Sequence, residues 1–233
     1  MSASPRFSPA PRLPLTPHQD VLDEMFHSLS QPLTSLRCSL ELSLEPPRGL
    51  SIEQALEQRK ESTLVALRHT EKVIGMVQLM REYLDAEQPA REGDTSELEV
   101  VLRNVIEDLS SVASMRGVRL CLIGTCAATV SFPESALRRA LQYLIAAVVD
   151  AQREGGIVML VLGAVSAAAL LRVDGEESFD GRAQSEANVP TTLRRMGIAT
   201  ARRVLENGGA TLVGGDVAPA GFFLRIPRRV ASV

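Results

Sequence analysis

Apolar residues recur every three or four positions along two long stretches of the N-terminal part of the chain, and this spacing limits the possible folds more than any other feature. The first stretch spans residues 18–44, and its stripe consists of Leu22, Met25, Leu29, Leu33, Leu36, Leu40 and Leu44. The second begins after Ser51, which together with Gln54 has the pattern of a helix cap, and it runs to about residue 87. This periodicity predicts two long helices joined by a short turn.

A helical hairpin of this kind cannot cover a full apolar stripe by itself, because each helix has only one neighbour. We therefore expect the hairpin to pair with a second copy as a dimeric four-helix bundle, with the stripe from Leu22 to Leu36 as the subunit seam. The alternative is that the hairpin packs on the C-terminal part of its own chain.

The rest of the chain divides into a leader, a boundary and a second domain. Residues 1–17 are proline-rich and predict a disordered leader, so the hairpin domain spans residues 18–88. The polar residues 86–96 mark the boundary, and residues 97–229 are predicted to form an α/β sandwich with helices on one face of a mixed sheet. The predicted helices are 98–115, 134–154 and 197–207, and the predicted strands are 118–124, 128–132, 157–163, 168–174, 210–215 and 221–227.

Composition narrows the range of partners. A net charge of −3, no Trp and only two Tyr provide neither general attraction to nucleic acid nor stacking surfaces for bases. No stretch reaches the roughly 18 apolar residues of a membrane helix, and three cysteines do not have zinc-site spacing. We expect a cytoplasmic protein that has no metal site. We expect its partners to be proteins or small molecules, and we do not expect it to bind nucleic acid or membranes.

His27 lies on the polar face of the first predicted helix, roughly opposite the leucine stripe. At about 100° per residue, the polar side chains of Asp20, Glu24, Gln31 and Thr34 fall within about 60° of it. This face is either a reactive site or an ordinary solvated surface. Pro32 removes one helical hydrogen bond at a cost of about 3 kcal/mol. Either the helix bends there, or it begins at Ser30 and leaves His27 in a loop.

The segment "FHSLSQPLTSLRCSLEL" resembles the H-box of bacterial sensor histidine kinases, in which a phosphoaccepting histidine is followed after four residues by a Pro-Leu pair. His27, Pro32 and Leu33 match that pattern. The hairpin resembles the HisKA-like dimerisation and phosphotransfer domain of the family. The C-terminal half is similar in element order to the family's Bergerat-type (HATPase-like) ATP-binding domain. The resemblance extends from about residue 18 to residue 229.

Two departures concern the reaction and the metal. The acidic residue that follows the histidine in the kinases is replaced by Ser28, so the general base for attack on ATP is missing. The asparagines of the family's N-box are replaced by Tyr143 and Ala147. Neither side chain is a typical ligand of Mg²⁺.

Two further departures concern the glycine boxes. The adenine-binding aspartate of the family has a counterpart in Asp174, but the two glycines of that motif are replaced by Glu176 and Ser178. In the second box Gly197 is retained, whereas Arg195 stands at the first glycine. Side chains thus occupy positions where backbone amides approach phosphates in the family.

A retained fold with a dismantled nucleotide site resembles the dimeric histidine phosphotransferases of bacterial phosphorelays. The resemblance implies that His27 is the phosphoacceptor, exchanging a phosphoryl group with receiver-domain aspartates without ATP. Glu24 and Thr34 are candidates for positioning, Gln31 is a candidate for a hydrolytic role, and Asp174 and Gly197 are remnants of the nucleotide site. The expected partners are response regulator receiver domains, which supply Mg²⁺, a second copy of the chain, and an upstream hybrid histidine kinase.

Two alternatives stay open at this point. One is a cytosolic histidine kinase that still binds ATP through Asp174. The other is a dimeric pseudokinase scaffold that holds a receiver or a kinase without accepting phosphate. Four arginines, Arg194, Arg195, Arg202 and Arg203, form a basic cluster that is either a receiver contact or a solvated helix face.

Overall fold

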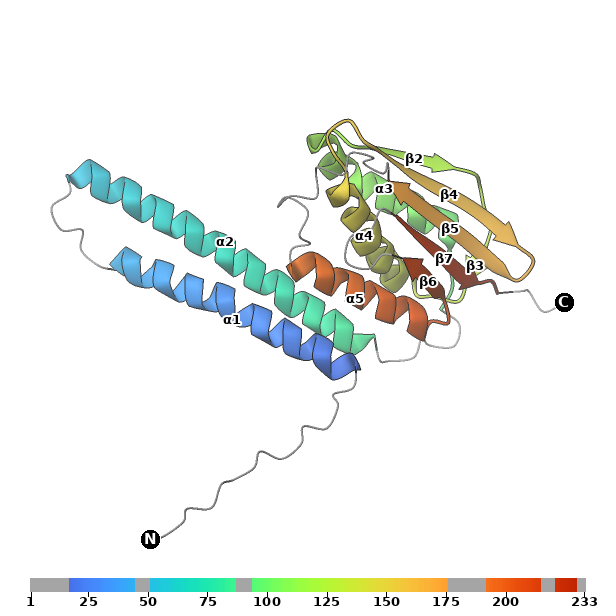
Figure 1. Ribbon diagram of the computed structural model, residues 1–233, viewed down its shortest axis with the longest axis horizontal. Coiled ribbons are helices and arrows are strands. Elements are labelled where there is room, and N and C mark those ends of the chain that lie inside the picture. The colour runs from blue at the N-terminus through green and yellow to red at the C-terminus, as the bar shows by residue number, and fades with distance from the viewer. Residues whose placement is uncertain (1–16, 45–50, 87–93, 176–191, 215–220, 230–233) are drawn as a thin grey trace, which may run out of the picture.

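Two long antiparallel helices project from one end of an α/β layer in the computed structural model (Figure 1). The described residues are 17–44, 51–86, 94–175, 192–214 and 221–229. The hairpin consists of α1 (Pro17–Leu44) and α2 (Ile52–Asp85). The predicted leader, apart from residue 17, and most of the predicted boundary lie outside the described residues, so the domain limits stay predictions.

The start of α2 is fixed by the predicted helix cap. The Ser51 hydroxyl accepts a hydrogen bond from the Gln54 amide at 3.2 Å, and the Gln54 side chain accepts one from the Ser51 amide at 3.1 Å. These two bonds satisfy backbone donors that have no partner inside the helix. The predicted start of α2 is therefore confirmed.

Helix α1 continues through Pro32, so the alternative in which His27 lies in a loop is wrong. Pro32 is buried, and its ring nitrogen cannot donate to the carbonyl of Ser28 four residues earlier. On either side of the proline, two hydroxyls donate to carbonyls one turn back: Ser30 to Phe26 at 3.2 Å and Thr34 to Ser30 at 2.9 Å. The helix therefore holds His27 in regular helical geometry.

The C-terminal part has three helices on one face of a mixed five-stranded sheet. The helices are α3 (Leu98–Met115), α4 (Glu134–Ala151) and α5 (Thr192–Asn207). The sheet has the order β2-β4-β5-β7-β6, with β2 (Arg119–Ile123), β4 (Ile157–Val165), β5 (Ala168–Gly175), β6 (Thr211–Gly214) and β7 (Gly221–Pro227). The β2–β4 pair is parallel and the others are antiparallel. A separate antiparallel pair joins β1 (Ser96–Glu97) to β3 (Thr129–Val130).

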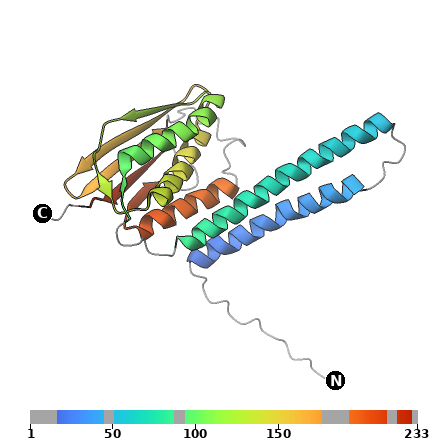
Figure 2. The same cartoon turned by 180° about the vertical axis from the view of Figure 1, so that it is seen from behind.

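Alternation along the strands explains why the helices cover one face only. In β7, Phe222, Leu224 and Ile226 are buried, whereas Phe223 and Arg225 point to the open face. Figure 2 shows the helices on the covered face of the sheet. Period-two alternation is typical of a sheet with one solvated face. The predicted α/β sandwich is confirmed.

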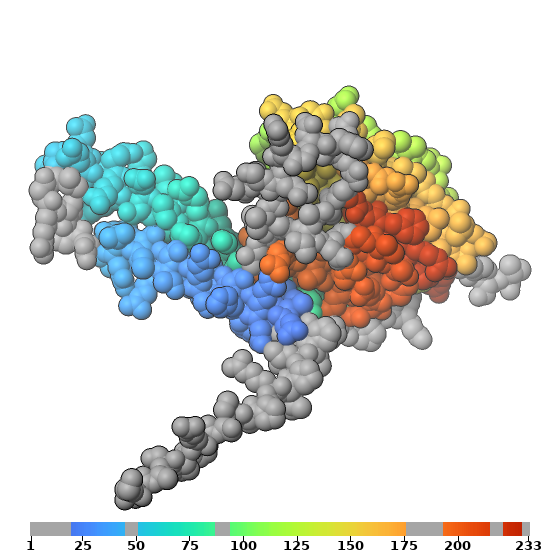
Figure 3. All heavy atoms as spheres, in the orientation of Figure 1, coloured from blue at the N-terminus to red at the C-terminus, as the bar shows by residue number. Residues whose placement is uncertain are grey.

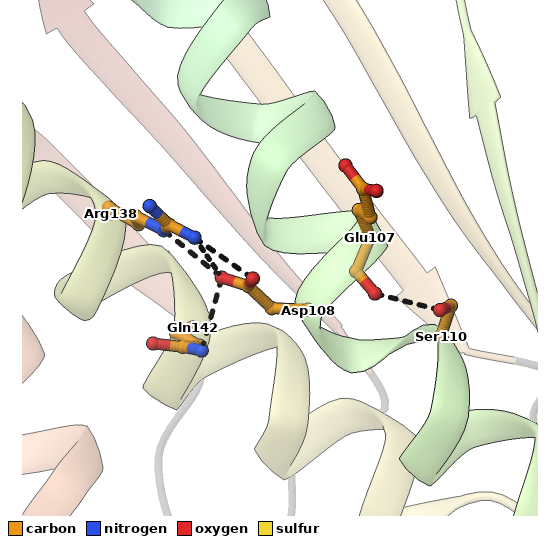
Figure 4. Close-up of polar contacts among 5 residues, drawn as sticks. All are labelled: Glu107, Asp108, Ser110, Arg138 and Gln142. Carbon is orange, nitrogen blue, oxygen red and sulfur yellow. Dashed lines mark hydrogen bonds and ion pairs between the residues drawn. The ribbon is translucent and has the colours of Figure 1, made fainter.

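Helices α3 and α4 are joined by an ion pair at their surface. Two guanidinium nitrogens of Arg138 lie 2.8–3.0 Å from the Asp108 carboxylate, and the Gln142 amide donates to the same carboxylate at 3.4 Å (Figure 4). On the same turn of α3, the Ser110 hydroxyl donates to the Glu107 carbonyl at 2.7 Å. A bidentate arginine fixes the relative orientation of the two helices as well as their distance.

Helix α5 begins at Thr192, five residues before the predicted start at Gly197. Its end agrees with the prediction, because Gly209 has a φ of 78° and its amide donates to the Glu206 carbonyl at 2.9 Å. A positive φ favours glycine after the last helical turn. The early start lengthens α5 by more than a turn, and this turn contacts the hairpin.

The base of the hairpin packs on α5, while the far half of the hairpin extends away from the C-terminal part (Figure 3). A buried cluster, called the docking cluster below, joins α1, α2 and α5; it comprises Met25, Met76, Leu79, Met80, Tyr83 and Met196. Met25 is completely buried within one protomer, so its predicted place in a subunit seam is wrong. The alternative of packing within the chain is correct for this end of the hairpin. No described helix has the length and hydrophobicity to cross a membrane.

Candidate active site

His27 lies on the side of α1 that faces away from α2. The imidazole is exposed, and Met25 on the opposite side of the helix is buried in the docking cluster. Glu24 and Gln31, one turn before and one turn after His27, are exposed as well. An exposed imidazole on a regular helix can meet an electrophile brought by a second protein, because its ring nitrogen is accessible and its backbone is held in place.

The two outer members of the predicted polar face differ in their surroundings. Asp20 is exposed in the first turns of α1, where a negative charge is favoured by the helix dipole. The Thr34 hydroxyl donates to the Ser30 carbonyl, which uses its proton within the helix. Thr34 can still accept a hydrogen bond from a partner. The structure thus places all five predicted polar residues on α1 and three of them, Glu24, His27 and Gln31, on consecutive turns of its exposed face.

Helix α5 brings a cation to this face. The Arg195 guanidinium lies 2.9 Å from one carboxylate oxygen of Glu24 and donates to the other at 3.2 Å. Glu24 precedes His27 by three residues, which is one helical turn. The two partners are 171 positions apart in the sequence, so no local pattern could have indicated the contact.

A second contact joins the C-terminal end of α2 to α4. The Tyr143 hydroxyl donates to the Glu82 carboxylate at 2.7 Å, and Arg139 lies 2.8 Å from the other carboxylate oxygen. Burial, and then the hydrogen bond to Glu82, raise the pKa of the Tyr143 hydroxyl. The hydroxyl therefore stays protonated over the physiological range and remains a donor to Glu82.

Replacing Tyr143 with phenylalanine should weaken the attachment of α4 to the hairpin by about 1 kcal/mol, because a partly buried hydrogen bond to a carboxylate is lost. The pKa of Tyr143 is raised on folding, so its contribution should be fully present below the ordinary value of 10.0 and decrease as the pH rises through the folded value. Urea unfolding of both proteins at pH 8 and above pH 10 measures this difference. A difference in unfolding free energy between the two proteins that increases with rising pH would contradict the hydrogen bond from the Tyr143 hydroxyl to Glu82.

Tyr143, Ala147 and Gly197 occupy positions that bind the phosphates or Mg²⁺ of a nucleotide in the family that the sequence resembles, so their surroundings show whether these ligands fit here. Ala147 is buried and offers only a methyl group, and the Tyr143 hydroxyl already binds Glu82. The Tyr143 ring packs against Gly197, because a Cβ atom added to Gly197 would lie 3.1 Å from the ring. The ring therefore covers the Cα of Gly197 on the side where other residues have a side chain. Within the described residues, no three His, Cys, Asp or Glu side chains are grouped to hold a metal. These positions do not fit the phosphate and metal ligands that the family resemblance implies.

Asp174, the predicted counterpart of the adenine-binding aspartate, lies apart from Tyr143, Ala147 and Gly197. The Asp174 carboxylate lies 2.7 Å from Arg172 on the same strand, and it lines a hollow with Met159 and Phe223. Tyr143 instead lines a cavity of about 420 Å³ between α4, α5 and the end of α2. Glu176 and Ser178 lie outside the described residues.

The predicted basic cluster is divided among several contacts. Arg203 is buried with its guanidinium 4.2 Å from the centre of the Tyr83 ring on α2. Arg194 lies 3.4 Å from Asp150, and Arg202 donates to the Gly214 carbonyl at 3.0 Å. A cation over an aromatic face is attractive, and more so when both are removed from water. The prediction of a solvated or receiver-contacting arginine is therefore wrong for Arg203, which binds the hairpin.

Neither a family model nor a curated protein matches the chain. Among solved structures, the histidine kinase AdeS of Acinetobacter baumannii is 15% identical and covers 88% of this chain and 98% of its own, with a TM-score of 0.62. Full-length ShkA in complex with AMPPNP is 21% identical, covers 94% of this chain and has a TM-score of 0.54; the match spans 47% of ShkA. The chain therefore has the fold of a histidine kinase, as predicted.

Proposed function

We propose that this chain, which has a histidine kinase fold, is a dimeric histidine phosphotransferase of a two-component phosphorelay with His27 as its phosphoacceptor. One observation carries the proposal: His27 is exposed on the hairpin, while Tyr143 and Arg195, at two positions matched to nucleotide ligands in the family, bind hairpin carboxylates instead. A protein that keeps the acceptor histidine and uses those positions for internal contacts is suited to receive a phosphoryl group already activated elsewhere.

The reaction is a transfer between an aspartyl phosphate and His27. A lone pair of a His27 ring nitrogen attacks phosphorus in line, and the electron pair of the breaking P–O bond stays on the receiver's aspartate, which leaves as a carboxylate. The proton on the other ring nitrogen is retained or released to water. The reverse step passes the group to the aspartate of a second receiver. Neither direction needs a base beside His27, which is consistent with Ser28 at the next position.

The receiver supplies Mg²⁺ in this proposal. The chain supplies the nucleophile and the docking surface, which includes Glu24 and Gln31 on the turns that flank His27. Gln31 is also suited to orient a water molecule toward a phosphoryl group on His27, since both side chains lie on the same exposed face. The phosphoryl group would come from an upstream hybrid histidine kinase through its receiver domain. A cytoplasmic location follows from these partners.

Dimerisation is proposed from the apolar residues that the protomer leaves uncovered. They include Leu33, Leu40 and Leu44 on α1 and Leu56, Leu64, Leu67, Ile74, Val77 and Leu84 on α2, and Phe26, Leu42 and Ile52 are exposed as well. The residues recur at helical spacing along both helices beyond and beside the docking cluster. A second hairpin would cover them as a four-helix bundle.

An ATP-dependent kinase is the second candidate, because Asp174 is retained and ShkA was solved with AMPPNP. Two incubations separate the candidates. The wild-type chain is mixed with γ-labelled ATP and Mg²⁺, and in parallel with receiver domains from the same genome that carry label from radioactive acetyl phosphate.

We expect acid-labile, base-stable label from a charged receiver and none from ATP. Label from ATP would identify a kinase and overturn the proposal. Binding of a charged receiver without transfer from any of those tested would also overturn it, and would indicate a scaffold.

A further inference from the structure

The ion pair between Arg195 and Glu24 is exposed enough to exchange partners. Half of the Arg195 side chain and 43% of the Glu24 side chain are accessible to solvent. Exposed pairs of this kind contribute little to stability, because water and salt screen them. The pair therefore keeps Arg195 beside the exposed face of α1 without binding it tightly.

The neighbours of Arg195 hold it at the level of His27. Met196 belongs to the docking cluster, and Leu193 packs against that cluster together with Leu22 and Leu29 of α1. The first turns of α5 are thus fixed against the part of α1 that contains His27. Residues three apart on a helix have side chains about 5–6 Å apart at Cβ, which a guanidinium on a long, half-exposed side chain can span.

We propose that Arg195 moves from Glu24 to the phosphoryl group when His27 is phosphorylated, and that Arg195 thereby stabilises the phosphorylated state. This inference rests on the proposed function of His27. A phosphoryl group has up to twice the charge of the Glu24 carboxylate and presents three acceptor oxygens, so it competes with Glu24 for the guanidinium. Arginine matches phosphate oxygens in a bidentate geometry that lysine cannot reproduce.

The proposal gives the two partners opposite effects. Arg195 lengthens the life of the phosphohistidine, because it neutralises the transferred group and shields it from water. Glu24 shortens that life, because it competes for Arg195. If the ion pair only attaches α5 to the hairpin, removing either partner breaks the same contact and both variants change in the same direction.

The experiment uses phosphoramidate, a small donor that transfers its phosphoryl group to imidazole with release of ammonia. Full-length wild type, Arg195→Gln, Arg195→Lys, Glu24→Gln and Asp23→Asn are phosphorylated, the donor is removed, and the decay of phosphohistidine is followed at neutral pH. His27→Ala provides the background from other histidines. Asp23 lies one turn before His27 and is the matched control, since Asp23→Asn removes the same charge as Glu24→Gln.

Arg195→Gln should shorten the half-life about tenfold, Arg195→Lys should restore part of it, and Glu24→Gln should lengthen it several-fold. The role of Arg195 would be overturned if Arg195→Gln and Glu24→Gln changed the half-life of phosphohistidine in the same direction. It would also be overturned if Glu24→Gln and Asp23→Asn changed that half-life equally. A wild type that takes no label at His27 would instead contradict the proposed function. Circular dichroism of each variant shows that the fold is retained.

Discussion

Replacing His27 with alanine should reduce phosphoryl transfer from a charged receiver by more than about 10³-fold, because the only attacking atom in the proposed reaction is removed. The side chain is exposed and makes no packing contribution to the docking cluster, so the fold should persist. Rapid-quench measurement of label on the chain and of label lost from the receiver gives the rate. Binding of the receiver, measured by calorimetry, should change little.

His69→Ala is the matched control for this substitution. His69 lies on α2 and is partly buried, so it offers the same chemistry in a less accessible place. We expect its transfer rate to stay within about twofold of the wild type. Transfer that survives in His27→Ala and disappears in His69→Ala would move the acceptor to α2, and transfer that survives in both variants would contradict the assignment of His27 as the only acceptor.

Replacing Leu67 with glutamate should convert a dimer into monomers. Leu67 is 54% exposed on α2, outside the docking cluster, so within one protomer it has little packing to lose. Burying a leucine is worth about 1.5–3 kcal/mol, and a two-fold interface contains the residue twice. A charge in the same place adds a desolvation cost, so the dissociation constant should rise by at least about 100-fold. Sedimentation velocity at micromolar concentration measures the change.

Val112→Glu is the control for this prediction. Val112 lies on α3, away from the hairpin, and it is 40% exposed, so the same charge is added at a similar degree of exposure. This variant should sediment as the wild type does. A wild-type protein that is monomeric at tens of micromolar would contradict the four-helix bundle, and a Leu67→Glu protein that stays dimeric would move the interface elsewhere.

The sequence predicted those parts of the fold that depend on local periodicity and on helix ends. The leucine spacing placed both hairpin helices, Ser51 and Gln54 placed the start of α2, and Gly209 placed the end of α5. The alternation of apolar and polar residues predicted the ends of the long strands to within a few residues. The start of α5 was predicted too late, because "TLRRM" before Gly197 contains two adjacent arginines and no clear apolar repeat.

Most of the site depends on contacts between distant residues, which periodicity does not detect. Glu82 and Tyr143 are 61 positions apart, and Met25 and Met196 belong to different parts of the chain. Tyr143 was predicted only as a replacement of asparagine that removes a nucleotide ligand, and Arg195 as a replacement of glycine and as part of a basic cluster. What they bind instead could be found only by placing α5 and α4 against the hairpin, and that placement follows from tertiary packing. The polar face around His27 was predictable because all its members lie on one helix.

The hydrogen bond between Tyr143 and Glu82 also affects how readily the chain could gain an ATP-dependent activity by mutation. Under the proposed function, asparagine at position 143 would supply one nucleotide ligand that the family resemblance implies, but it would also remove a hydrogen bond worth about 1 kcal/mol between α4 and the hairpin. Such a variant would be attached less firmly to the hairpin before it could use a nucleotide, since Ala147 and Arg195 would still be in place. Selection would then act against each step taken alone. Under the proposed function, a structural hydrogen bond at the position of a nucleotide ligand thus makes an ATP-dependent activity difficult to gain by single substitutions.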